Sequence, residues 1–209
     1  MSHVSVIIPT YERAELLLTR SVPSVLAQTH TDWDLHVVGD GARPEVEAAM
    51  ATVNDPRIKF TQRPRQDYPE QNPYWAWSCR GADAINYGLD TALGEFVCTL
   101  GDDDEFMPNF METLLGLIEE NDLDMAYGRS EIVGYGFLGD GHPACGSQTN
   151  DMIWRLNGIR QDPHCYLRGL PNDWDLFSRI IQGGAKWLWT PTVVYRYYAA
   201  NFIPGCSPT

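Results

Sequence analysis

The amino-acid sequence predicts an α/β fold built on a mostly parallel, doubly wound sheet. Short apolar runs that suit strands alternate with longer segments that suit helices, a pattern typical of parallel sheets covered by helices. The first run, residues 4–10 (VSVIIPT), is apolar almost throughout and contains a proline near its end, as expected of a buried central strand. Polar residues follow several of these runs, which places them at the carboxyl ends of strands, where open α/β sheets bind ligands.

The predicted elements can be assigned in order along the chain. Pro23 interrupts the first helix-like segment, so we expect a kink or a restart there. The last helix has Asn172 or Asp173 as its expected N-cap. We expect helices at residues 11–27, 44–53, 79–91, from 108 onward and at 172–181, strands at 4–10, 34–38, 57–60, 95–99, 123–133, 186–189 and 193–198, loops at 61–78 and 134–150, and a strand or short turn at 151–158.

Length, composition and charge exclude several classes of function. The chain has 209 residues, 44% hydrophobic and 21% charged, which suits a single globular α/β domain. Its net charge of −13 argues against a nucleic-acid binder and against attachment to anionic lipid. No apolar run approaches the ~20 residues of a transmembrane helix, and residues 1–4 lack the pattern of a signal peptide. We therefore expect no nucleic-acid partner, no transmembrane segment and a cytoplasmic location, and we leave the oligomeric state open.

The cysteine spacing and a glycine-rich segment give little evidence of function. Five cysteines occur without CxxC spacing, which favours reduced thiols in a cytoplasmic protein. A zinc site is the alternative, with His142, Cys145, His164 and Cys165 as ligands, although the last two are adjacent and close a tetrahedron poorly. Residues 134–139 match the dinucleotide-binding fingerprint by letters, but no helix-like segment follows them, so we reject that interpretation.

An acidic cluster follows the strand predicted at residues 95–99. Asp102, Asp103 and Asp104 stand together before the helix predicted from residue 108. Carboxylates this close repel one another and raise each other's pKa. A hard divalent cation with oxygen ligands, Mn²⁺ or Mg²⁺, offsets that repulsion. The alternative is a solvated acidic turn at the start of a helix, but the position at a strand end favours a metal site.

Two other predicted strands also end in polar residues. Thr10 and Tyr11 follow the first strand, and Asp40 follows the second. Together with the acidic cluster they supply what a nucleoside diphosphate needs, namely an acceptor for the base or ribose and a cation at the pyrophosphate. Arg80 offers a planar, permanently charged group for phosphate or base. The alternatives are that Asp40 caps a turn and that Arg80 is a helix-surface residue.

A series of segments stands in a characteristic order along the chain. They are VSVIIPTY from residue 4, SVLAQTH from 24, VGDG from 38, NYGL from 86 with ALGEF from 92, LGDDD from 100 and NDWDL from 172. Their order and spacing resemble family-2 glycosyltransferases with the GT-A fold, from residue 4 to about residue 198. The resemblance implies one domain over residues 1–209, with a nucleotide-sugar half to about residue 105 and a smaller, mixed acceptor half from about residue 106. It also implies transfer of a sugar, with inversion, from a nucleotide-sugar donor to an acceptor hydroxyl.

The resemblance further implies roles for individual residues. The segment after the first strand corresponds to the part that cradles the base, and Asp40 to the aspartate that reads uracil or ribose, which favours UDP. Asp103 falls on the metal-ligating aspartate of the DxD-type motif, with Asp104 as a reserve ligand. Asp173 falls on the expected general base, the alternative being a simple helix cap. The residues implied to bind the nucleotide-sugar are Pro9, Thr10, Tyr11, Glu12, Asp40, Arg80 and Asp102.

The chain also departs from the family pattern. Gly101 stands where many members carry the first aspartate of DxD, and Tyr197-Tyr198 lacks a histidine often found after Arg196, so strict metal dependence stays open. Two other functions are retained as alternatives. A sugar-phosphate nucleotidyltransferase is expected to show a basic, glycine-rich loop that residues 9–20 lack, and a degenerate nucleotide-sugar-binding module would not need Asp173. The acceptor, whether a glycan, a lipid-linked sugar or a small molecule, is not identified.

Overall fold

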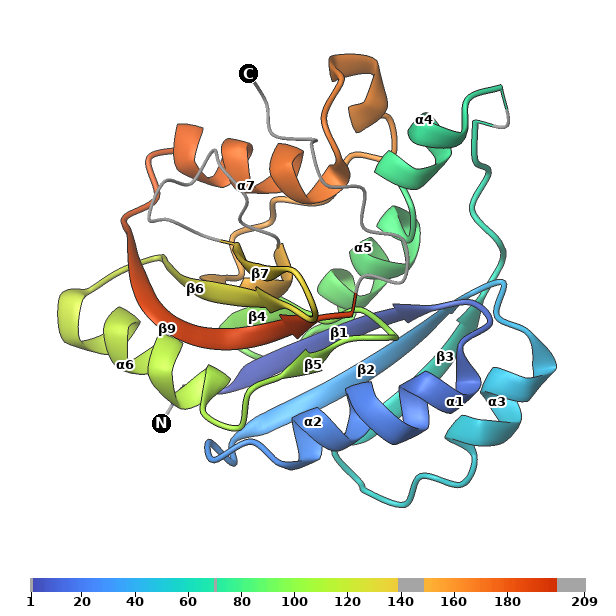
Figure 1. Cartoon of the computed structure of the whole chain (residues 1–209), viewed down its shortest axis with the longest axis horizontal. Coiled ribbons are helices and arrows are strands. Elements are labelled where there is room, and N and C mark those ends of the chain that lie inside the picture. The colour runs from blue at the N-terminus through green and yellow to red at the C-terminus, as the bar shows by residue number, and fades with distance from the viewer. Residues whose placement is uncertain (1, 70, 139–148, 199–209) are drawn as a thin grey trace.

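The computed structural model describes residues 2–69, 71–138 and 149–198, which form one nine-stranded sheet with helices on both faces (Figure 1). The strand order is β3-β2-β1-β4-β8-β6-β9-β5, and β7 pairs with β6. The strands are β1 (Val4–Thr10), β2 (Trp33–Asp40), β3 (Ile58–Arg63), β4 (Phe96–Thr99), β5 (Glu105–Phe106), β6 (Met125–Ile132), β7 (Gly136–Leu138), β8 (Met152–Arg155) and β9 (Trp187–Tyr197).

The first half of the sheet is parallel. β1 pairs with β2 from Val4↔Trp33 to Thr10↔Gly39, and with β4 from Val4↔Phe96 to Ile7↔Thr99. β2 pairs with β3 in the same sense. The predicted parallel α/β sheet is therefore confirmed, and the carboxyl ends of these four strands lie at one edge.

The second half of the sheet is mixed. β8 runs antiparallel to both β4 and β6, and β9 runs parallel to β6 and antiparallel to β5. The prediction of two separate strands near the end was wrong, because β9 is continuous from Trp187 to Tyr197. Its register against β6 shifts on either side of Arg129, and this irregularity accommodates Pro191, which has no N–H for a regular ladder.

The helices also match the predicted order, with local differences. The expected restart at Pro23 is confirmed, since a π-helical segment ends just before it and α2 begins with Pro23 in its first turn. The loop predicted at 61–78 is only partly a loop, because β3 extends to Arg63 and a short helix occupies its end. The helices are α1 (Ala14–Leu16), the π-helix η1 (Leu17–Ser21), α2 (Val22–Leu26), α3 (Pro44–Met50), α4 (Pro73–Ser78), α5 (Ala82–Thr91), α6 (Phe110–Asn121), α7 (Asn172–Gln182) and the 3-10 segments η2 (Thr149–Asp151) and η3 (Cys165–Arg168).

The loop predicted at 134–150 contains β7 and the start of η2, while residues 139–148 lie outside the described residues. His142 and Cys145 of the alternative zinc site fall in that segment. Cys79, Cys98 and Cys165 are buried free thiols. None of the helices in the described parts of the chain combines the length and the apolar content that a bilayer span requires.

Two apolar clusters lie on opposite faces of the sheet. Val4, Val6 and Ile8 of β1 pack with residues of α2, α3 and α6, whereas Ile7 packs on the other face with residues of α5 and α7. The alternation follows from the two-residue period of a strand. Because β1 is buried on both faces, its carboxyl end is held rigidly at the centre of the edge where the polar residues gather.

Candidate active site

Polar side chains converge at the carboxyl edge of the parallel strands. β1, which ends at Thr10, lies between β2, which ends at Asp40, and β4, which leads into the acidic cluster. The hydroxyl of Thr10 donates a hydrogen bond to Oδ2 of Asp102 over 2.9 Å, and both residues are buried. The structure thus brings together the end of β1 and the acidic cluster, which are far apart in sequence.

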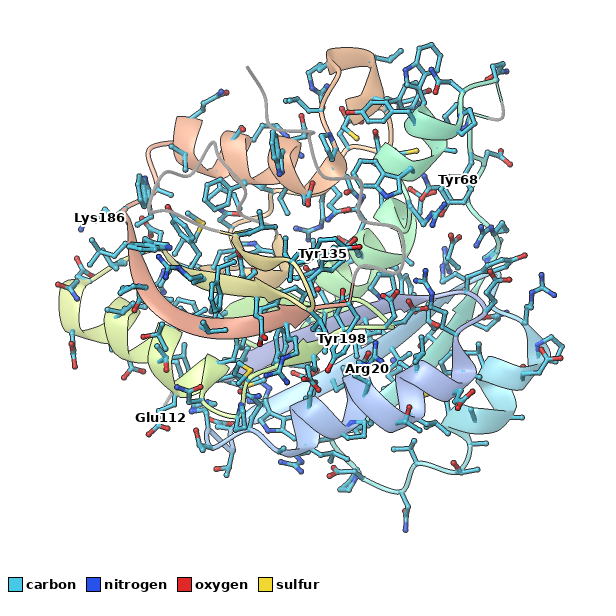
Figure 2. The ribbon with its side chains drawn as sticks, in the orientation of Figure 1. Arg20, Tyr68, Glu112, Tyr135, Lys186 and Tyr198 are labelled. Atoms are coloured by element: carbon cyan, nitrogen blue, oxygen red, sulfur yellow. The ribbon has the colours of Figure 1, made fainter. Side chains whose placement is uncertain are left out.

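Asp102 and Asp103 share one arginine. Nη1 of Arg13 lies 3.0 Å from Oδ1 of Asp102 and 3.1 Å from Oδ2 of Asp103. Burial raises the pKa of Asp103, Arg13 opposes this effect, and the charge of Asp102 adds to it. Arg20 donates to the backbone carbonyl of Asp103 and lies over the ring of Tyr198, 3.5 Å from its centroid (Figure 2). Neither arginine is among the residues predicted from the sequence.

Asp104 is held by hydrogen bonds from two tyrosines. The hydroxyl of Tyr195 donates to its Oδ2, and the backbone N–H of Tyr198 donates to its Oδ1 over 2.8 Å. Burial, together with the charge of Asp103, raises the pKa of Asp104 to about 7. Both oxygens of this expected reserve metal ligand are therefore already engaged by β9 and the residue after it.

The same arrangement accounts for Gly101. A Cβ atom at this position would lie 2.7 Å from Oδ2 of Asp104, closer than real side chains approach. An aspartate at residue 101 would therefore require the Asp104 carboxylate to move away from Tyr195. A glycine at residue 101 therefore leaves the room that the observed position of the Asp104 carboxylate needs.

Asp40 is buried and binds the segment that follows β3. Its Oδ1 accepts the backbone N–H of Gln66 over 2.7 Å, and its Oδ2 accepts the hydroxyl of Tyr68 and an N–H of Arg65 at 3.3 Å. The guanidinium of Arg65 also lies over the ring of Tyr11, 3.6 Å from its centroid. Arg65 and Tyr68 thus join Asp40 and Tyr11 in one cluster, although the sequence reasoning assigned them no role.

The remaining predicted donor residues have varied surroundings. Pro9 lies against Gly81, because a Cβ atom added to Gly81 would come 3.1 Å from the Cβ atom of Pro9. Glu12 forms an ion pair with Arg43 at 3.2 Å, and both side chains are more than half exposed. Arg80 is exposed, and its backbone carbonyl accepts a hydrogen bond from Nδ2 of Asn172 over 3.1 Å. Arg80 therefore lies next to the start of α7, and its side chain faces solvent.

Asp173 lies in the first turn of α7. The expected side-chain cap is wrong, because Pro171 is the N-cap residue and no side chain caps the helix. Oδ1 of Asp173 accepts the backbone N–H of Trp174 over 2.8 Å. Burial raises the pKa of Asp173 to about 6, and this hydrogen bond opposes the rise. The carboxylate is mostly ionised at neutral pH but is basic enough to accept a proton.

Tyr197 connects Asp173 to the acidic cluster. Burial raises the pKa of its hydroxyl, and the charges of Asp104, Asp103 and Asp173 raise it further. The Tyr197 side chain is therefore within electrostatic reach of both the acidic cluster and the first turn of α7. The charges of Asp173 and Asp103, which are separated by 70 positions in the sequence, therefore both act on one tyrosine hydroxyl.

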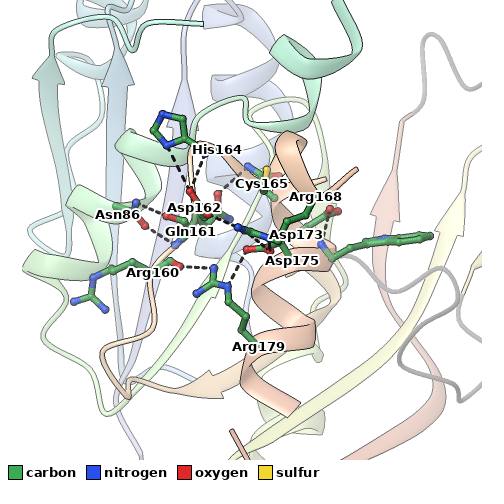
Figure 3. Close-up of polar contacts among 12 residues, drawn as sticks. Asn86, Arg160, Gln161, Asp162, His164, Cys165, Arg168, Asp173, Asp175 and Arg179 are labelled. Carbon is green, nitrogen blue, oxygen red and sulfur yellow. Dashed lines mark hydrogen bonds and ion pairs between the residues drawn. The ribbon is translucent and has the colours of Figure 1, made fainter. Parts of the chain in front are cut away.

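A network of arginines and carboxylates fixes α7 to the segment before it (Figure 3). Asp175 is buried, and its two oxygens accept N–H groups of Arg168 and Arg179, each over 2.8 Å. Asn86 of α5 exchanges two hydrogen bonds with the backbone of Gln161, of 2.7 and 2.8 Å. Asp175 lies two residues from the predicted base. Both of its carboxylate oxygens are bound by arginine side chains, so neither is free to accept a substrate proton.

The acidic cluster offers a divalent cation two carboxylates, Asp102 and Asp103. Among the residues that the structure describes, no group of three or more His, Cys, Asp or Glu is arranged to hold a metal. Mg²⁺ and Mn²⁺, however, often use only one or two carboxylates when substrate phosphates complete the coordination shell. Asp103 fits this mode with Asp102 beside it, whereas Asp104 is held by Tyr195 and Tyr198.

The structure defines an α/β protein with polar residues gathered at the carboxyl ends of its parallel strands, and comparison with known proteins gives its family. The family described as Glycosyl transferase family 2 matches residues 5–72 and 76–168, so the chain belongs to this family. The UDP-Glc:alpha-D-GlcNAc-diphosphoundecaprenol beta-1,3-glucosyltransferase WfgD of Escherichia coli is 31% identical over 130 residues, which cover 62% of this chain and 46% of that protein. The chain therefore spans less than half the length of that relative.

Solved structures confirm the fold. TarS 1-349 of S. aureus in complex with UDP-GlcNAc superposes with a TM-score of 0.74 at 16% identity, covering 96% of this chain and 62% of that one. The mannosyltransferase PcManGT from Pyrobaculum calidifontis, in complex with GDP-Man and Mn²⁺, gives a TM-score of 0.65 at 13% identity over 95% of this chain and 57% of that one. At these identities the likeness concerns the GT-A fold alone.

Proposed function

We propose that this chain is a glycosyltransferase that moves a sugar from a nucleotide-diphospho-sugar to an acceptor hydroxyl with inversion, assisted by a divalent cation. Membership of glycosyl transferase family 2 supports the class of reaction. The E. coli relative is named for a UDP-sugar, and the S. aureus structure contains UDP-GlcNAc, which favours UDP as the nucleotide.

The observation that carries this proposal is the position of Asp173 relative to the acidic cluster. The charges of both act on the Tyr197 hydroxyl, which supports a base and a phosphate-binding region close to one another. Direct displacement with inversion needs the acceptor's base and the leaving diphosphate on opposite sides of the sugar. We assign Asp173 the removal of the acceptor proton, for which a pKa of about 6 is well suited near neutral pH.

We assign the nucleoside to the cluster at the end of β2. Tyr11 offers a ring face, Arg65 offers N–H donors, and Asp40 holds Arg65 and Tyr68 in place. Thr10 and Asp102 lie beside this cluster, toward the acidic segment, and are assigned to the ribose or the sugar. Pro9, Glu12 and Arg80 stay predicted donor contacts.

A divalent cation bound at Asp103 would neutralise charge that develops on the departing diphosphate. The chain's own residues contribute positive charge at the same place. Arg13 contacts Asp102 and Asp103, and Arg20 holds the backbone carbonyl of Asp103. These contacts fix the acidic segment against the η1 region, so Asp103 is already oriented when the donor binds.

We propose that the acceptor saccharide binds along α4 and η3, on the same side of the sheet as α7 (Figure 1). Tyr74, Trp75 and Trp77 are 48%, 36% and 51% exposed, and the ring of Trp75 stacks on that of Tyr166 with centroids 5.3 Å apart. Sugar rings present C–H faces that pack on such rings, while their hydroxyl groups remain at the edges. The net charge of −13 disfavours a strongly anionic acceptor.

Calorimetry with UDP and GDP, each with and without Mn²⁺, tests the donor assignment. We expect UDP to bind more tightly than GDP, and Asp40→Ala to weaken UDP binding by about 1–3 kcal/mol because partners of a buried carboxylate are left unpaired. Asp103→Asn should abolish the effect of Mn²⁺ on UDP binding, whereas Asp122→Asn, at an exposed aspartate paired with Lys186, should not. A preference for GDP, or an unchanged effect of Mn²⁺ in Asp103→Asn, would contradict the assignment.

A further inference from the structure

Arg13 occupies the space between the two carboxylates at which the cation is expected. A single nitrogen, Nη1, contacts Asp102 at 3.0 Å and Asp103 at 3.1 Å. Arg13 immediately precedes α1 and reaches across the carboxyl edge of β1 to the acidic cluster. The positive charge that offsets the repulsion between these carboxylates therefore comes from the chain itself.

We propose that Arg13 is an internal counter-cation of this site, which holds Asp102 and Asp103 before the donor arrives and releases Asp103 when nucleoside diphosphate and divalent cation bind together. The proposal rests on the proposed function in that Asp103 is the residue that would hold the cation. It predicts that a divalent ion alone competes with Arg13 and binds weakly, and that the nucleotide relieves this competition.

The Arg13 side chain can leave its two carboxylate partners without disturbing the segment that carries them. The side chain is 44% exposed, so the guanidinium can move into solvent, whereas the side chains of Asp102 and Asp103 are only 10% and 21% exposed. When Arg13 leaves, Asp102 still accepts the hydroxyl of Thr10, and the backbone of Asp103 is still held by Arg20. Ser21 also donates to the carbonyls of Gly101 and Asp104, each over 2.9 Å. The acidic segment therefore keeps its conformation without Arg13.

The charges around the site explain why cation and nucleotide should bind together. Asp104 accepts hydrogen bonds from Tyr195 and Tyr198, so the carboxylates that contact Arg13 directly are Asp102 and Asp103, while the charge of Asp104 acts on Arg13 from further away. The Arg13 guanidinium already neutralises part of the negative charge of these two carboxylates. A divalent ion that approaches them is also repelled by the guanidinium, because both are positive. A diphosphate adds negative charge and oxygen ligands for the ion, and guanidinium groups bind phosphate oxygens well.

Titration of Mn²⁺ in the absence of nucleotide, followed by the EPR signal of the free ion, tests the proposal. Arg13→Gln should bind Mn²⁺ about tenfold more tightly than the wild type, because the competing guanidinium charge at Asp102 and Asp103 is removed. Arg13→Lys keeps the charge and should stay within about threefold of the wild type. Arg57→Gln removes the same charge at a distant arginine, which pairs with Asp55, and should leave Mn²⁺ binding unchanged.

Equal Mn²⁺ affinity in Arg13→Gln and the wild type, with both proteins folded by circular dichroism, would overturn the proposal. So would an equal gain in Arg57→Gln, since that would reflect net charge alone. Repeating the titration with UDP separates this result from the proposed function. If UDP does not bind the wild type, the donor assignment fails, while the nucleotide-free comparison still decides the role of Arg13.

Discussion

Asp173 has a raised pKa in the first turn of an amphipathic helix, within electrostatic reach of Tyr197. Asp173→Asn keeps the size of the side chain and its ability to accept the N–H of Trp174, but it removes the basic group. We expect near-wild-type UDP binding and a fall in transfer of about 10²–10⁴-fold, the range of general-base assistance. Single-turnover transfer assays alongside UDP calorimetry measure the two effects separately.

The pH dependence of transfer follows from the same residue. Because the pKa of Asp173 is raised to about 6, its basic form is lost as pH falls through that value. The wild-type rate should therefore drop below about pH 6, and the residual rate of Asp173→Asn should not show this limb. A rate for the variant within a few-fold of wild type, or the same acidic limb in both proteins, would remove Asp173 from the mechanism.

Residues at strand ends are those whose positions the sequence predicts well, while their roles stay predictions. Thr10, Asp40 and the acidic cluster follow apolar runs directly, and a parallel sheet brings the ends of such runs to one edge. Arg13, Arg65 and Tyr68 were missed because their partners lie 25 to 90 positions away and no local pattern marks them. Asp175, two residues after Asp173 on α7, is bound by Arg168 and Arg179, and only the structure shows these contacts.

At the scale of elements, Asp175 ties α7 to the segment that precedes it. Asp175→Ala leaves Arg168 and Arg179 without their shared buried partner, so we expect the free energy of unfolding to fall by about 1–3 kcal/mol. Hydrogen exchange in residues 159–168 should speed up, since Arg168 and Gln161 lie in that segment. Asp90→Ala is the control, because Asp90 is 63% exposed in its pair with Arg160 and should cost no more than ~0.5 kcal/mol. Equal costs in urea unfolding would show that Asp175 has no special role.

The exposed aromatic rings of α4 and η3 suggest a second test at this scale. Trp75→Ala removes the ring that stacks on Tyr166, and we expect the acceptor KM to rise about tenfold while UDP binding is unchanged. Trp75→Phe keeps a ring face and should lose less. Leu93→Ala, at an apolar side chain that is 81% exposed, is the control for loss of surface hydrophobicity. A change in UDP affinity with an unchanged acceptor KM would assign this surface to another role.

Local irregularities are what the sequence could not predict at the element scale. The π-helical turn at Leu17–Ser21 directs Ser21 to the carbonyls of Gly101 and Asp104, and nothing in the sequence periodicity marks it. The strands expected at residues 186–189 and 193–198 form one strand, β9, because the shift in register opposite Gly128 accommodates Pro191. In both places tertiary contacts override local preference.

At the scale of the whole molecule, one sheet joins the two halves of the chain. β4 pairs with β8, so the parallel half that carries Thr10 and Asp40 continues directly into the mixed half that carries β9. Tyr195 and Tyr198 reach from that second half to Asp104 in the first. The candidate site is therefore built on a rigid sheet whose integrity depends on how closely helices pack on its centre. The expected division near residue 105 stays a prediction.

Gly88 offers a test of that packing, because it lies where α5 crosses β1 at the centre of the sheet. A Cβ atom at Gly88 would come 2.5 Å from Cγ2 and 2.9 Å from Cγ1 of Ile7. Gly88→Ala should therefore lower the free energy of unfolding by about 1–3 kcal/mol through overpacking, even though alanine favours the helix. Gly116→Ala is the matched control in α6, where an added Cβ atom meets nothing within 4 Å, and it should raise the free energy of unfolding by about 0.5–1 kcal/mol. Urea unfolding of both variants measures these changes. Stabilisation by Gly88→Ala would mean that α5 can move away from β1, and that the centre of the sheet is less tightly packed than its contacts indicate.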